Sequence, residues 1–342
     1  MQPEPNPEPN PAPVHGAPIR VAIVGHGNLG RGVERALTLC PDMELVAIFT
    51  RRDPVDVAPA VAGTRVLHID ELADFENSVD VAILCGGSKS DLRDQGPALA
   101  ARFTTVDSFD THADIPDYFD DLDAPARANG NTALLSTGWD PGLFSINRLL
   151  GEAILPDGET YTFWGRGLSQ GHSDAVRRVP GVAAGVQYTH PSADAIARVK
   201  EGTRPELTTQ EKHTRECFVV LEEGADAATV HEAIVGMPNY FEPFETTVHF
   251  ITAEELARDH SAMPHGGFVL RSGSTGDNNP QVMEFGLALE SNPEFTASVV
   301  VAYARAAHRL NQQGVHGAVT PFDVAPGLLS PKTPAQLRAE LL

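Results

Sequence analysis

A glycine-rich turn near the start of the chain constrains the fold more than any other feature. The run Ile19–Val24 (IRVAIV) is typical of a buried strand, and a helical pattern begins shortly after it. Between them a G-x-G-x-x-G motif is spelled by Gly25, His26, Gly27, Asn28, Leu29 and Gly30. The first glycine allows a tight turn, the second lets a pyrophosphate approach the backbone, and the third lets the helix pack on the strand. Because a helix N-terminus also attracts phosphate, we predict a dinucleotide site here and not an ordinary glycine-rich turn.

Length, charge and cysteine content limit the class of protein. The chain has 342 residues, of which 42% are hydrophobic, which is enough for two domains with sizeable cores. The net charge of −21 argues against nucleic acid and anionic membrane as partners, so neighbouring arginines become informative. No apolar run approaches the ~20 residues of a membrane span, and no signal peptide is visible. Three well-separated cysteines without a CxxC pair predict a cytoplasmic protein with neither a disulfide nor a metal site.

The chain divides into a tail and two expected domains. Residues 1–18 repeat a PEPNP-type pattern, which predicts a disordered Pro-rich tail and favours a solvated segment over a docking one. Residues 19–138 form the expected dinucleotide-binding domain, which residues 293–342 complete. Residues 139–292 form the expected substrate-binding and dimerisation domain.

Strands and helices alternate through the first domain. This pattern predicts an α/β fold, a Rossmann-type doubly wound parallel sheet with helices on both faces. After the first strand, the expected strands are Glu44–Phe49, Asp80–Leu84, Thr104–Val106 and Thr132–Leu135. The expected helices are Asn28–Cys40, Ser90–Phe103 and Ile115–Asn129.

The rhythm changes near residue 138, where longer loops separate the elements. Strands are expected at Phe218–Leu221, Thr246–Ile251 and Gly267–Leu270, with a helix over Ala227–Val235. They predict an α+β domain with a mostly antiparallel or mixed sheet. Because an open sheet face needs a partner, a homodimer is expected.

The final helix is expected after the start signal Asn292-Pro293, running over Phe295–Gln313 and stopping at Gly314. One face of this helix is expected to pack in the core of the first domain, through Val299, Tyr303, Ala306 and Leu310.

Two loops of the first domain bear on the cofactor. The second strand ends in Thr50, Arg51 and Arg52, where an NAD-binding fold usually carries an acid for the ribose hydroxyl. Arginine pairs instead with a 2′-phosphate, so NADP is favoured over NAD, with Asp53 as a mild counter-signal and a solvated basic pair as the alternative. A second loop follows a buried strand and should lie at the carboxyl edge of the sheet. It contains Cys85, Gly86, Gly87 and Ser88, and the cysteine is expected to be a packing residue and not a nucleophile.

Three polar stretches carry the candidate chemistry: residues 106–112, 136–142 and 163–174. Asp110 and Asp140 follow successive strands, so both should approach the nicotinamide end of the cofactor. Either acid alone could be a simple loop or cap residue. As a pair, two carboxylates suit a cationic or amino-bearing substrate.

These stretches together resemble the meso-diaminopimelate dehydrogenase family. The similarity runs from Ile19 to about Pro331 and is carried by the following segments: VAIVGHGNLGR, IFTRR, VDSFD, STGWDPG, FWGRGLSQGHSDAVRRVPGV, CFVV, MPHGG and FTASVVVAYARAAHR. His26 stands where the family often has tyrosine. The resemblance implies reversible NADP-dependent oxidation of the D-centre of meso-2,6-diaminopimelate to L-2-amino-6-oxopimelate, which cyclises to tetrahydrodipicolinate, with release of ammonia, in lysine biosynthesis.

The resemblance also implies residue roles. Asp110 and Asp140 surround the reacting amino group, with the role of base unassigned between them. Arg215 is expected to bind the distal carboxylate. The remaining expected substrate contacts are Trp164, Gln170, Gly171, Thr189, His265 and Asn279. Besides the glycine turn, the arginine pair and the loop at Cys85, the expected cofactor contacts include Asp107, Ser108 and Phe109. His172, Arg177 and Arg178 are plausible neighbours without assigned roles.

Two other functions fit parts of the same sequence. One is a related NADP-dependent enzyme, such as a broader D-amino-acid or a homoserine-type dehydrogenase. The other is a non-catalytic NADP-sensing protein, because fold alone does not establish activity. The presence of both aspartates and of the whole block at residues 163–174 argues against the second alternative.

Overall fold

A computed structural model of the protein describes residues 17–238 and 240–342, and two compact units are present in it. The first unit extends to Pro141 and includes Thr296–Leu342, and the second is Gly142–Phe295. The boundaries expected from sequence, at 138/139 and 292/293, lie within three residues of these divisions. The predicted tail, apart from its last two residues, lies outside the described part of the chain.

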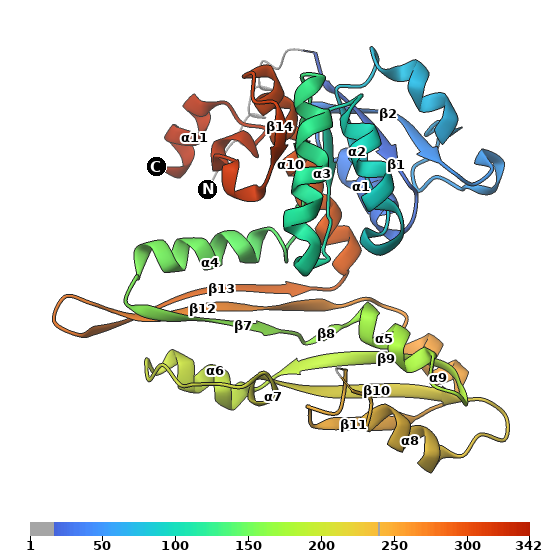
Figure 1. The fold of residues 1–342 in the computed structure, drawn as a ribbon, viewed down its shortest axis with the longest axis vertical. Helices are drawn as coiled ribbons and strands as arrows, with labels where there is room; N and C mark the ends of the chain where they lie inside the picture. The colour runs from blue at the N-terminus through green and yellow to red at the C-terminus, as the bar shows by residue number, and fades with distance from the viewer. Residues whose placement is uncertain (1–16, 239) are drawn as a thin grey trace, which may run out of the picture. The chain divides into compact units, whose positions relative to one another are not determined.

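The first unit is built on a seven-stranded sheet with the order β14-β6-β5-β4-β1-β2-β3 (Figure 1). Every pairing in this sheet is parallel, which confirms the predicted Rossmann-type fold. The strands are β1 (Ile19–Val24), β2 (Met43–Thr50), β3 (Val66–His68), β4 (Val81–Leu84), β5 (Thr105–Asp107), β6 (Thr132–Leu134) and β14 (Gly317–Val319). The short strands β3 and β14 are absent from the sequence prediction.

Helices cover this sheet. The α-helices are α1 (Asn28–Leu37), α2 (Arg93–Ala100), α3 (Ile115–Ala128), α10 (Asn292–Gln312) and α11 (Pro334–Leu341). A π-helical turn, Ser88–Leu92, precedes α2, so the predicted helix from Ser90 has an irregular first turn. On one face, Tyr118 and Leu122 of α3 pack with Ala22 and Phe49 of the sheet. The predicted core face of α10 is confirmed, since all four of its residues are buried.

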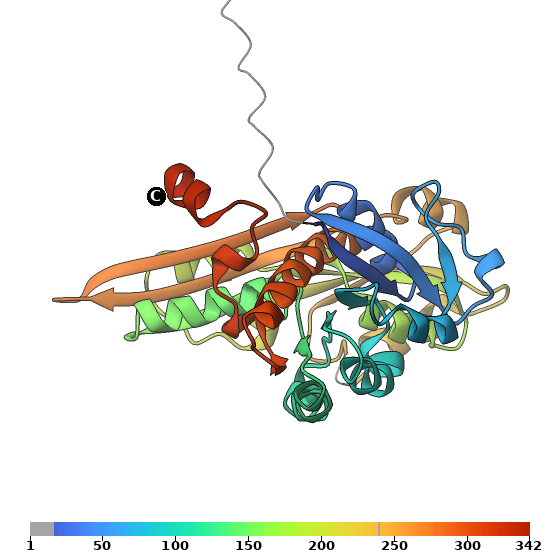
Figure 2. The same cartoon turned by 90° about the horizontal axis from the view of Figure 1, so that it is seen from above.

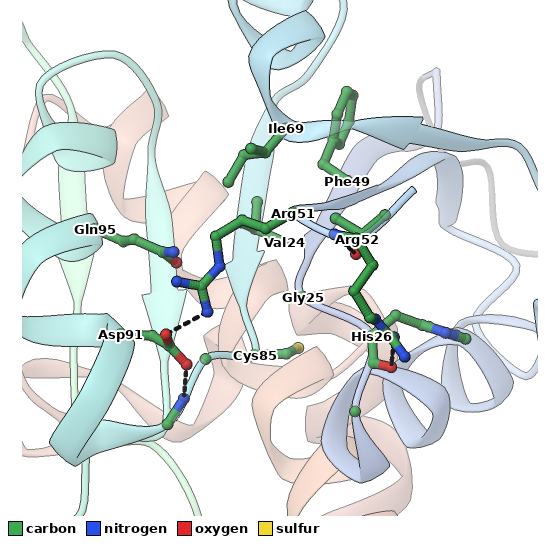
Figure 3. Close-up of a pocket in the computed structure, with 14 residues that line it drawn as sticks. Val24, Gly25, His26, Phe49, Arg51, Arg52, Ile69, Cys85, Asp91 and Gln95 are labelled. Carbon is green, nitrogen blue, oxygen red and sulfur yellow. Dashed lines mark hydrogen bonds and ion pairs between the residues drawn. The ribbon is translucent and has the colours of Figure 1, made fainter. Parts of the chain in front are cut away.

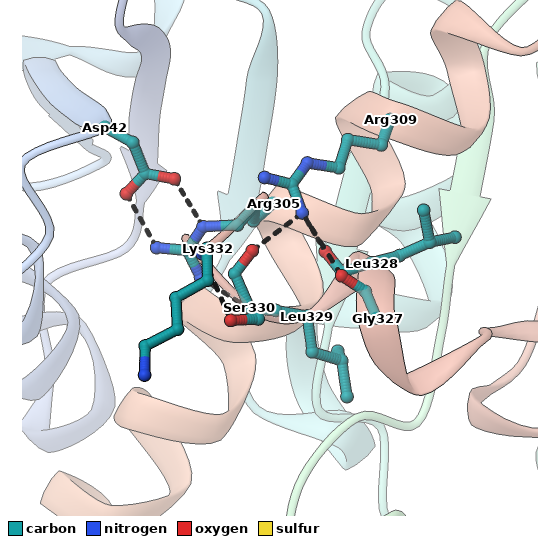
Figure 4. A network of polar contacts seen from close by, with 8 residues as sticks. All are labelled: Asp42, Arg305, Arg309, Gly327, Leu328, Leu329, Ser330 and Lys332. Atoms are coloured by element: carbon teal, nitrogen blue, oxygen red, sulfur yellow. Dashed lines mark hydrogen bonds and ion pairs between the residues drawn. The ribbon is translucent and has the colours of Figure 1, made fainter. Parts of the chain in front are cut away.

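The segment that follows β14 is tied to α10 by two arginines (Figure 4). The buried Arg305 donates from Nε and Nη2 to both carboxylate oxygens of Asp42, at 2.5 and 2.8 Å. Arg309 donates from Nη1 to the carbonyl oxygens of Leu328 and Ser330, at 2.9 and 2.7 Å. Arg305 also donates from Nη1 to the Leu329 carbonyl oxygen at 2.9 Å. Both arginines therefore anchor the C-terminal segment to α10 through its carbonyl oxygens.

The second unit contains two sheets, β11-β10-β9-β8 and β13-β12-β7. Their pairings are antiparallel except for the parallel β10–β11 pair, which confirms the expected mixed α+β domain. The strands are β7 (Gly158–Trp164), β8 (Gly167–Leu168), β9 (Val182–Pro191), β10 (His213–Leu221), β11 (Thr246–Phe250), β12 (His265–Thr275) and β13 (Asn279–Leu289). The helices are α4 (Leu143–Ile154), α5 (Gln170–Arg177), α6 (Ala193–Lys200), α7 (Thr209–Lys212), α8 (Ala227–Val235) and α9 (Ala253–Asp259).

Each sheet of the second unit has its own apolar packing. Val176 of α5 and Ile234 of α8 pack against Cys217 and Val219 on one face of β10. Val199 of α6 packs against β7 and β12 of the other sheet. Figure 2 shows the long β12–β13 ribbon with α4 alongside it, and Figure 1 shows α4 and α6 on opposite faces of that sheet.

Candidate functional site

The glycine turn between β1 and α1 has the geometry that dinucleotide binding requires. Gly25 has φ +95°, a conformation that residues with a side chain rarely adopt. A Cβ on Gly30 would lie 2.3 Å from the Gly25 carbonyl oxygen, so only glycine lets α1 pack this closely. A Cβ on Gly27 would meet nothing within 4 Å, which leaves open space at the N-terminus of α1. The predicted roles of the three glycines therefore agree with the structure, and the turn can accept a pyrophosphate.

The imidazole of His26 is buried, and its Nε2 lies 2.9 Å from Oε2 of the equally buried Glu34. Glu34 also accepts hydrogen bonds from the main-chain N–H groups of Ala60 and Val61, at 2.8 and 2.9 Å. Glu34 therefore ties both the His26 ring and the loop after β2 to α1. Because the His26 ring is buried, its predicted cofactor contact would come from the main chain. The His26 carbonyl oxygen accepts a hydrogen bond from Nη2 of Arg52 at 2.8 Å.

A cavity of about 400 Å³ extends from this turn (Figure 3). It is lined by the glycine turn, by Thr50, Arg51 and Arg52, and by the loop at Cys85, Gly86 and Gly87. Thus the structure brings the three predicted parts of the cofactor site together in one place. Phe49 and Ile69 supply apolar walls suited to a base, and the two arginines supply positive charge suited to phosphate.

Asp91 also lines this cavity, and it is absent from the sequence prediction. Its carboxylate accepts hydrogen bonds from Nη2 of Arg51 at 2.5 Å, from the Gly87 N–H at 3.0 Å and from the Ser90 hydroxyl at 3.1 Å. Burial by itself would raise the pKa of Asp91, but the hydrogen bonds from Gly87, Arg51 and Ser90 lower it below its usual value. Asp91 thus holds one of the two arginines from the opposite side of the cavity.

The thiol of Cys85 lacks the lowered pKa of a reactive cysteine. Burial raises its pKa to about 12, so the thiolate is not populated near neutral pH. This agrees with the expected packing role. Ser88, in the same loop, accepts a hydrogen bond from the Asp110 N–H at 3.0 Å, which links this loop to the one after β5.

Asp107 and Phe109 organise the loop after β5 from within the core. The buried Asp107 carboxylate accepts hydrogen bonds from the N–H groups of Phe109 and Ser136 and from the Tyr118 hydroxyl, at 2.9, 3.1 and 2.8 Å. Burial outweighs these hydrogen bonds and raises the pKa of Asp107 to about 6. Phe109 is buried and stacks on Tyr118 at 4.2 Å. Their predicted cofactor contacts would therefore be made by main-chain atoms, whereas Ser108 is half-buried.

Asp110 and Asp140 lie in the loops that follow β5 and β6, which are neighbouring parallel strands. Both loops leave the carboxyl edge of the sheet, as the sequence predicts. The Asp110 side chain is exposed and Asp140 is half-buried. The carboxyl edge of an open parallel sheet is where such folds bind ligands, so both acids stand in a position suited to chemistry.

In the second unit, strand register gathers four predicted substrate residues. Thr189 pairs with Arg215 across β9 and β10 and with Gly167 across β8. Leu168 of β8 donates its N–H to the carbonyl oxygen of Pro264, next to His265, at 2.8 Å. Trp164 pairs with Gly267 of β12, and its N–H donates to Nε2 of His213 at 2.8 Å. Trp164, Thr189, Arg215 and His265 therefore lie within one neighbourhood.

Arg215 is the most unusual charge in this group. Its side chain is 9% exposed, and burial lowers its pKa to about 10. Its Nη1 donates to the Thr189 hydroxyl, and its guanidinium carbon lies 4.1 Å from the centre of the Phe244 ring. Within residues 17–238 and 240–342 no carboxylate forms an ion pair with it, and its buried Nε has no hydrogen-bond partner. A buried guanidinium without a counter-charge is costly, and an anionic ligand would compensate it.

Gln170 and Gly171 form the first turn of α5, whose N-terminus follows Ser169. Gly171 is exposed there, with open space around it. His172, which the sequence left unassigned, accepts or donates a hydrogen bond at Nδ1 with the Ser169 hydroxyl at 2.8 Å. Burial, with a contribution from Arg215, lowers the pKa of His172 to about 4, so its imidazole is neutral near pH 7.

The predicted role of Asn279 is wrong. Asn279 pairs with Thr275 at one end of the β12–β13 ribbon, and His265 pairs with Leu289 at the other end. These pairs stand ten residues apart along β12, a separation of roughly 34 Å. A small diamino diacid cannot touch both residues. The sequence prediction took Asn279 from the family resemblance, and no local pattern shows how far it lies from His265.

The described part of the chain contains neither a metal-binding cluster nor a membrane-spanning helix. Among residues 17–238 and 240–342, no cluster of three or more His, Cys, Asp or Glu side chains could hold a metal ion. In the same described residues, no helix combines the length and the apolar character needed to cross a membrane.

Comparison with known proteins identifies relatives along the whole chain. Residues 138–291 match the family model described as the diaminopimelic acid dehydrogenase C-terminal domain. The chain is 61% identical over 324 residues to meso-diaminopimelate D-dehydrogenase of Ureibacillus thermosphaericus, covering 95% of this chain and 99% of that one. A solved structure of a multiply substituted Clostridium tetani meso-diaminopimelate dehydrogenase with DAP has a TM-score of 0.90 and 53% identity, covering 95% of this chain and 100% of that one.

A third relative is an engineered D-amino acid dehydrogenase solved with bound NADP⁺. It has a TM-score of 0.82 and 45% identity, and it covers 95% of this chain and 100% of its own. Identity at these levels over nearly all of both chains goes well beyond a shared fold. The protein therefore belongs to the meso-diaminopimelate D-dehydrogenase family.

Proposed function

We propose that this protein catalyses the reversible NADP-dependent oxidation of the D-centre of meso-2,6-diaminopimelate. In balanced form, the substrate, NADP⁺ and water give L-2-amino-6-oxopimelate, ammonia, NADPH and a proton. The observation that carries the proposal is the buried Arg215, whose charge has no carboxylate partner among the described residues. In a chain with a net charge of −21, a buried cation without a protein counter-ion points to an anionic ligand, which a substrate carboxylate supplies.

The cavity at the glycine turn supports NADP as the cofactor. Gly27 leaves room for a pyrophosphate, and Arg51 and Arg52 provide two guanidinium groups where a ribose 2′-phosphate would lie. A related engineered D-amino acid dehydrogenase binds NADP⁺. When bound, the nicotinamide accepts the hydride that leaves the substrate Cα, and the protein supplies orientation and proton transfer.

Asp110 and Asp140 are proposed to hold the reacting amino group. An ammonium must lose a proton before hydride can leave the same carbon, and a carboxylate within hydrogen-bond reach can hold that ammonium and accept the proton, directly or through water. Loss of hydride leaves an imine on the substrate, and addition of water followed by loss of ammonia gives the ketone. The role of base stays unassigned between the two acids.

The distal end of the substrate must be held so that only the D-centre meets the cofactor. We assign its carboxylate to Arg215 and Thr189, with His265 beside them. Trp164, 36% exposed, offers an indole N–H and an apolar face to the substrate chain. Gln170 and Gly171 are assigned to the carboxylate of the D-centre.

The spacing of the substitutions in the Clostridium tetani variant points to a different asparagine as the substrate contact. That variant is changed at a Gln, a Thr, an Arg, a Pro, a His and an Asn that follow one another at intervals of 19, 26, 49, 1 and 27 residues. The same residue types follow at the same intervals here: Gln170, Thr189, Arg215, Pro264, His265 and Asn292. Asn292 donates its main-chain N–H to the Met263 carbonyl oxygen at 2.9 Å, two residues before His265. We therefore propose Asn292 in place of Asn279.

We also propose that the protein works as a homodimer in the cytoplasm. One surface suits a second copy of the chain: α4 exposes Leu149, Leu150 and Ile154, at 46%, 45% and 57%. Three large apolar side chains within six residues of one helix form a patch that a partner would cover.

The proposed function is tested with purified protein, meso-diaminopimelate and either NADP⁺ or NAD⁺, by following absorbance of the reduced cofactor. NADP⁺ reduction with meso-diaminopimelate, and much slower reduction with L,L-diaminopimelate, is the expected result. Faster turnover of D-lysine or homoserine than of meso-diaminopimelate would instead assign a related dehydrogenase. Cofactor binding without turnover of any of these substrates would indicate an NADP-sensing protein.

A further inference from the structure

Among the described residues of the second unit, no carboxylate forms an ion pair with the Arg215 guanidinium. Its Nη1 donates to the Thr189 hydroxyl, and its main-chain N–H donates to the Glu245 carbonyl oxygen at 2.9 Å. The nearby His172 is neutral near pH 7 because burial lowers its pKa to about 4. The thiol of Cys217 is neutral as well, since burial raises its pKa to about 12. Besides the Thr189 hydroxyl, the guanidinium contacts an aromatic ring.

That ring belongs to Phe244, in the loop that leads into β11. The guanidinium carbon of Arg215 lies 4.1 Å from the ring centre, well inside the range of a cation–π interaction. The loop is fixed on both sides of this contact. The Phe244 N–H donates to the Phe241 carbonyl oxygen at 2.8 Å, and the carbonyl of the next residue, Glu245, accepts the main-chain N–H of Arg215.

We propose that Phe244 is the positioning residue that holds the Arg215 guanidinium ready for the distal carboxylate of the substrate. The inference rests on the proposed function, because it requires that Arg215 bind that carboxylate. A protein carboxylate at this place would fix the arginine more strongly, but it would occupy the same N–H groups that the substrate needs. The face of a phenyl ring attracts the cation without using an N–H group. Phe244 therefore fixes the guanidinium of Arg215 and leaves its N–H groups available for the substrate carboxylate.

The contact also explains how a charge without a counter-ion is tolerated at 9% exposure. A cation–π contact is stronger when water is excluded, and a fixed guanidinium loses less rotational freedom when a ligand binds. Phe244 should consequently influence binding of the distal carboxylate and not the chemistry at the D-centre.

The test compares Phe244→Leu, which keeps apolar bulk without the ring, with Phe244→Tyr, which keeps the ring. Phe244→Leu should raise the KM for meso-diaminopimelate on the order of tenfold, with kcat little changed, and Phe244→Tyr should stay near the wild-type KM. D-lysine lacks the distal carboxylate, so its inhibition constant against meso-diaminopimelate should be the same in all three proteins. The matched control is Phe218→Leu, which should leave KM unchanged. It removes a ring of β10, the strand that also carries Arg215, and this ring stacks on His249 at 4.9 Å.

An equal loss of affinity for meso-diaminopimelate and D-lysine in Phe244→Leu, or an unchanged KM, would overturn the inference. Thermal melts of each variant separate unfolding from a binding defect. Arg215→Met separates a failure of the proposed distal clamp from a failure of the proposed role of Phe244. If Arg215→Met leaves KM unchanged, the proposed distal clamp fails; if it raises KM while Phe244→Leu does not, only the role of Phe244 fails.

Discussion

The two arginines that follow β2 have different hydrogen-bond partners. Arg52 donates to the His26 carbonyl oxygen and so braces the glycine turn, whereas Arg51 reaches across the cavity to Asp91. Arg51 remains 61% exposed in its side chain, so its ion pair with Asp91 is screened and weak on its own. An arginine held in this way keeps further N–H groups for a phosphate, and this distinguishes the pair from two solvated surface charges.

Replacing both arginines should therefore separate the two nicotinamide cofactors. In Arg51→Ala/Arg52→Ala, the dissociation constant for NADP should rise about 10- to 100-fold, because charge-assisted hydrogen bonds to the 2′-phosphate contribute about 1.5–3 kcal/mol each. NAD, which lacks that phosphate, should lose much less. Cofactor titration by fluorescence measures both constants, with Arg31→Ala, an exposed arginine of α1, as the control. An equal loss for NAD and NADP would remove the 2′-phosphate role.

Sequence could predict the place of these arginines because strand ends in a parallel sheet share one edge. It could not predict their partners. Asp91 lies forty residues away, and the His26–Glu34 contact depends on how α1 packs. The error at Asn279 has the same origin, since only the register of the β12–β13 ribbon shows that this residue lies far from His265.

At the scale of elements, the carboxyl edge of the parallel sheet depends on one buried acid. Asp107 ends β5, and its three hydrogen bonds join the loop after β5, the loop after β6 and α3. The loops that carry Asp110 and Asp140 are thus positioned by a side chain that is itself 1% exposed. Burial of this carboxyl raises its pKa to about 6, so the folded state binds a proton that the unfolded state releases.

This shift gives stability a defined dependence on pH. Between the ordinary aspartate pKa of 3.8 and about 6, the folded state holds the proton more tightly, so the free energy of unfolding falls as pH rises through this window. The loss amounts to about 3 kcal/mol by the linkage relation. In Asp107→Asn, whose Oδ1 can still accept from Phe109 and Ser136, this part of the slope should vanish. Urea unfolding of both proteins at several pH values between 4 and 7 tests it, and parallel curves would contradict it.

Sequence predicted the elements of the first unit better than those of the second for a physical reason. Strands such as β1 and β4 are buried on both faces and read as continuous apolar runs. In β13 the first four residues are all exposed and apolar alternation begins only at Met283, so the full length of the strand becomes evident only through its pairing with β12. The antiparallel strands β7 and β9 are also absent from the sequence prediction, because polar residues and glycine interrupt their apolar positions.

At the scale of the whole molecule, the distribution of charge and apolar surface bears on assembly. A net charge of −21 keeps copies of the chain apart unless a specific surface overcomes the repulsion. We propose the α4 patch of Leu149, Leu150 and Ile154 as this surface, because it places large apolar side chains on one helix of the second unit. Phe144 and Gly151 bury the opposite side of α4, so the exposed leucines are not needed to hold the helix in place.

Because the exposed leucines of α4 are not needed to hold the helix in place, replacing them should affect assembly and not folding. Wild-type protein should have a mass in solution of twice 36.5 kDa, and Leu149→Asp/Leu150→Asp should have the mass of a single chain. Two buried carboxylates without partners would each cost several kcal/mol in a closed interface, far more than the cost at an exposed helix surface. Light scattering after size exclusion measures the masses, and circular dichroism checks that the variant is folded. Leu39→Asp, at a leucine that is 83% exposed in the first unit, is the matched control and should remain dimeric. A monomeric wild type would contradict the dimer, and a dimeric double variant would place the interface elsewhere than on α4.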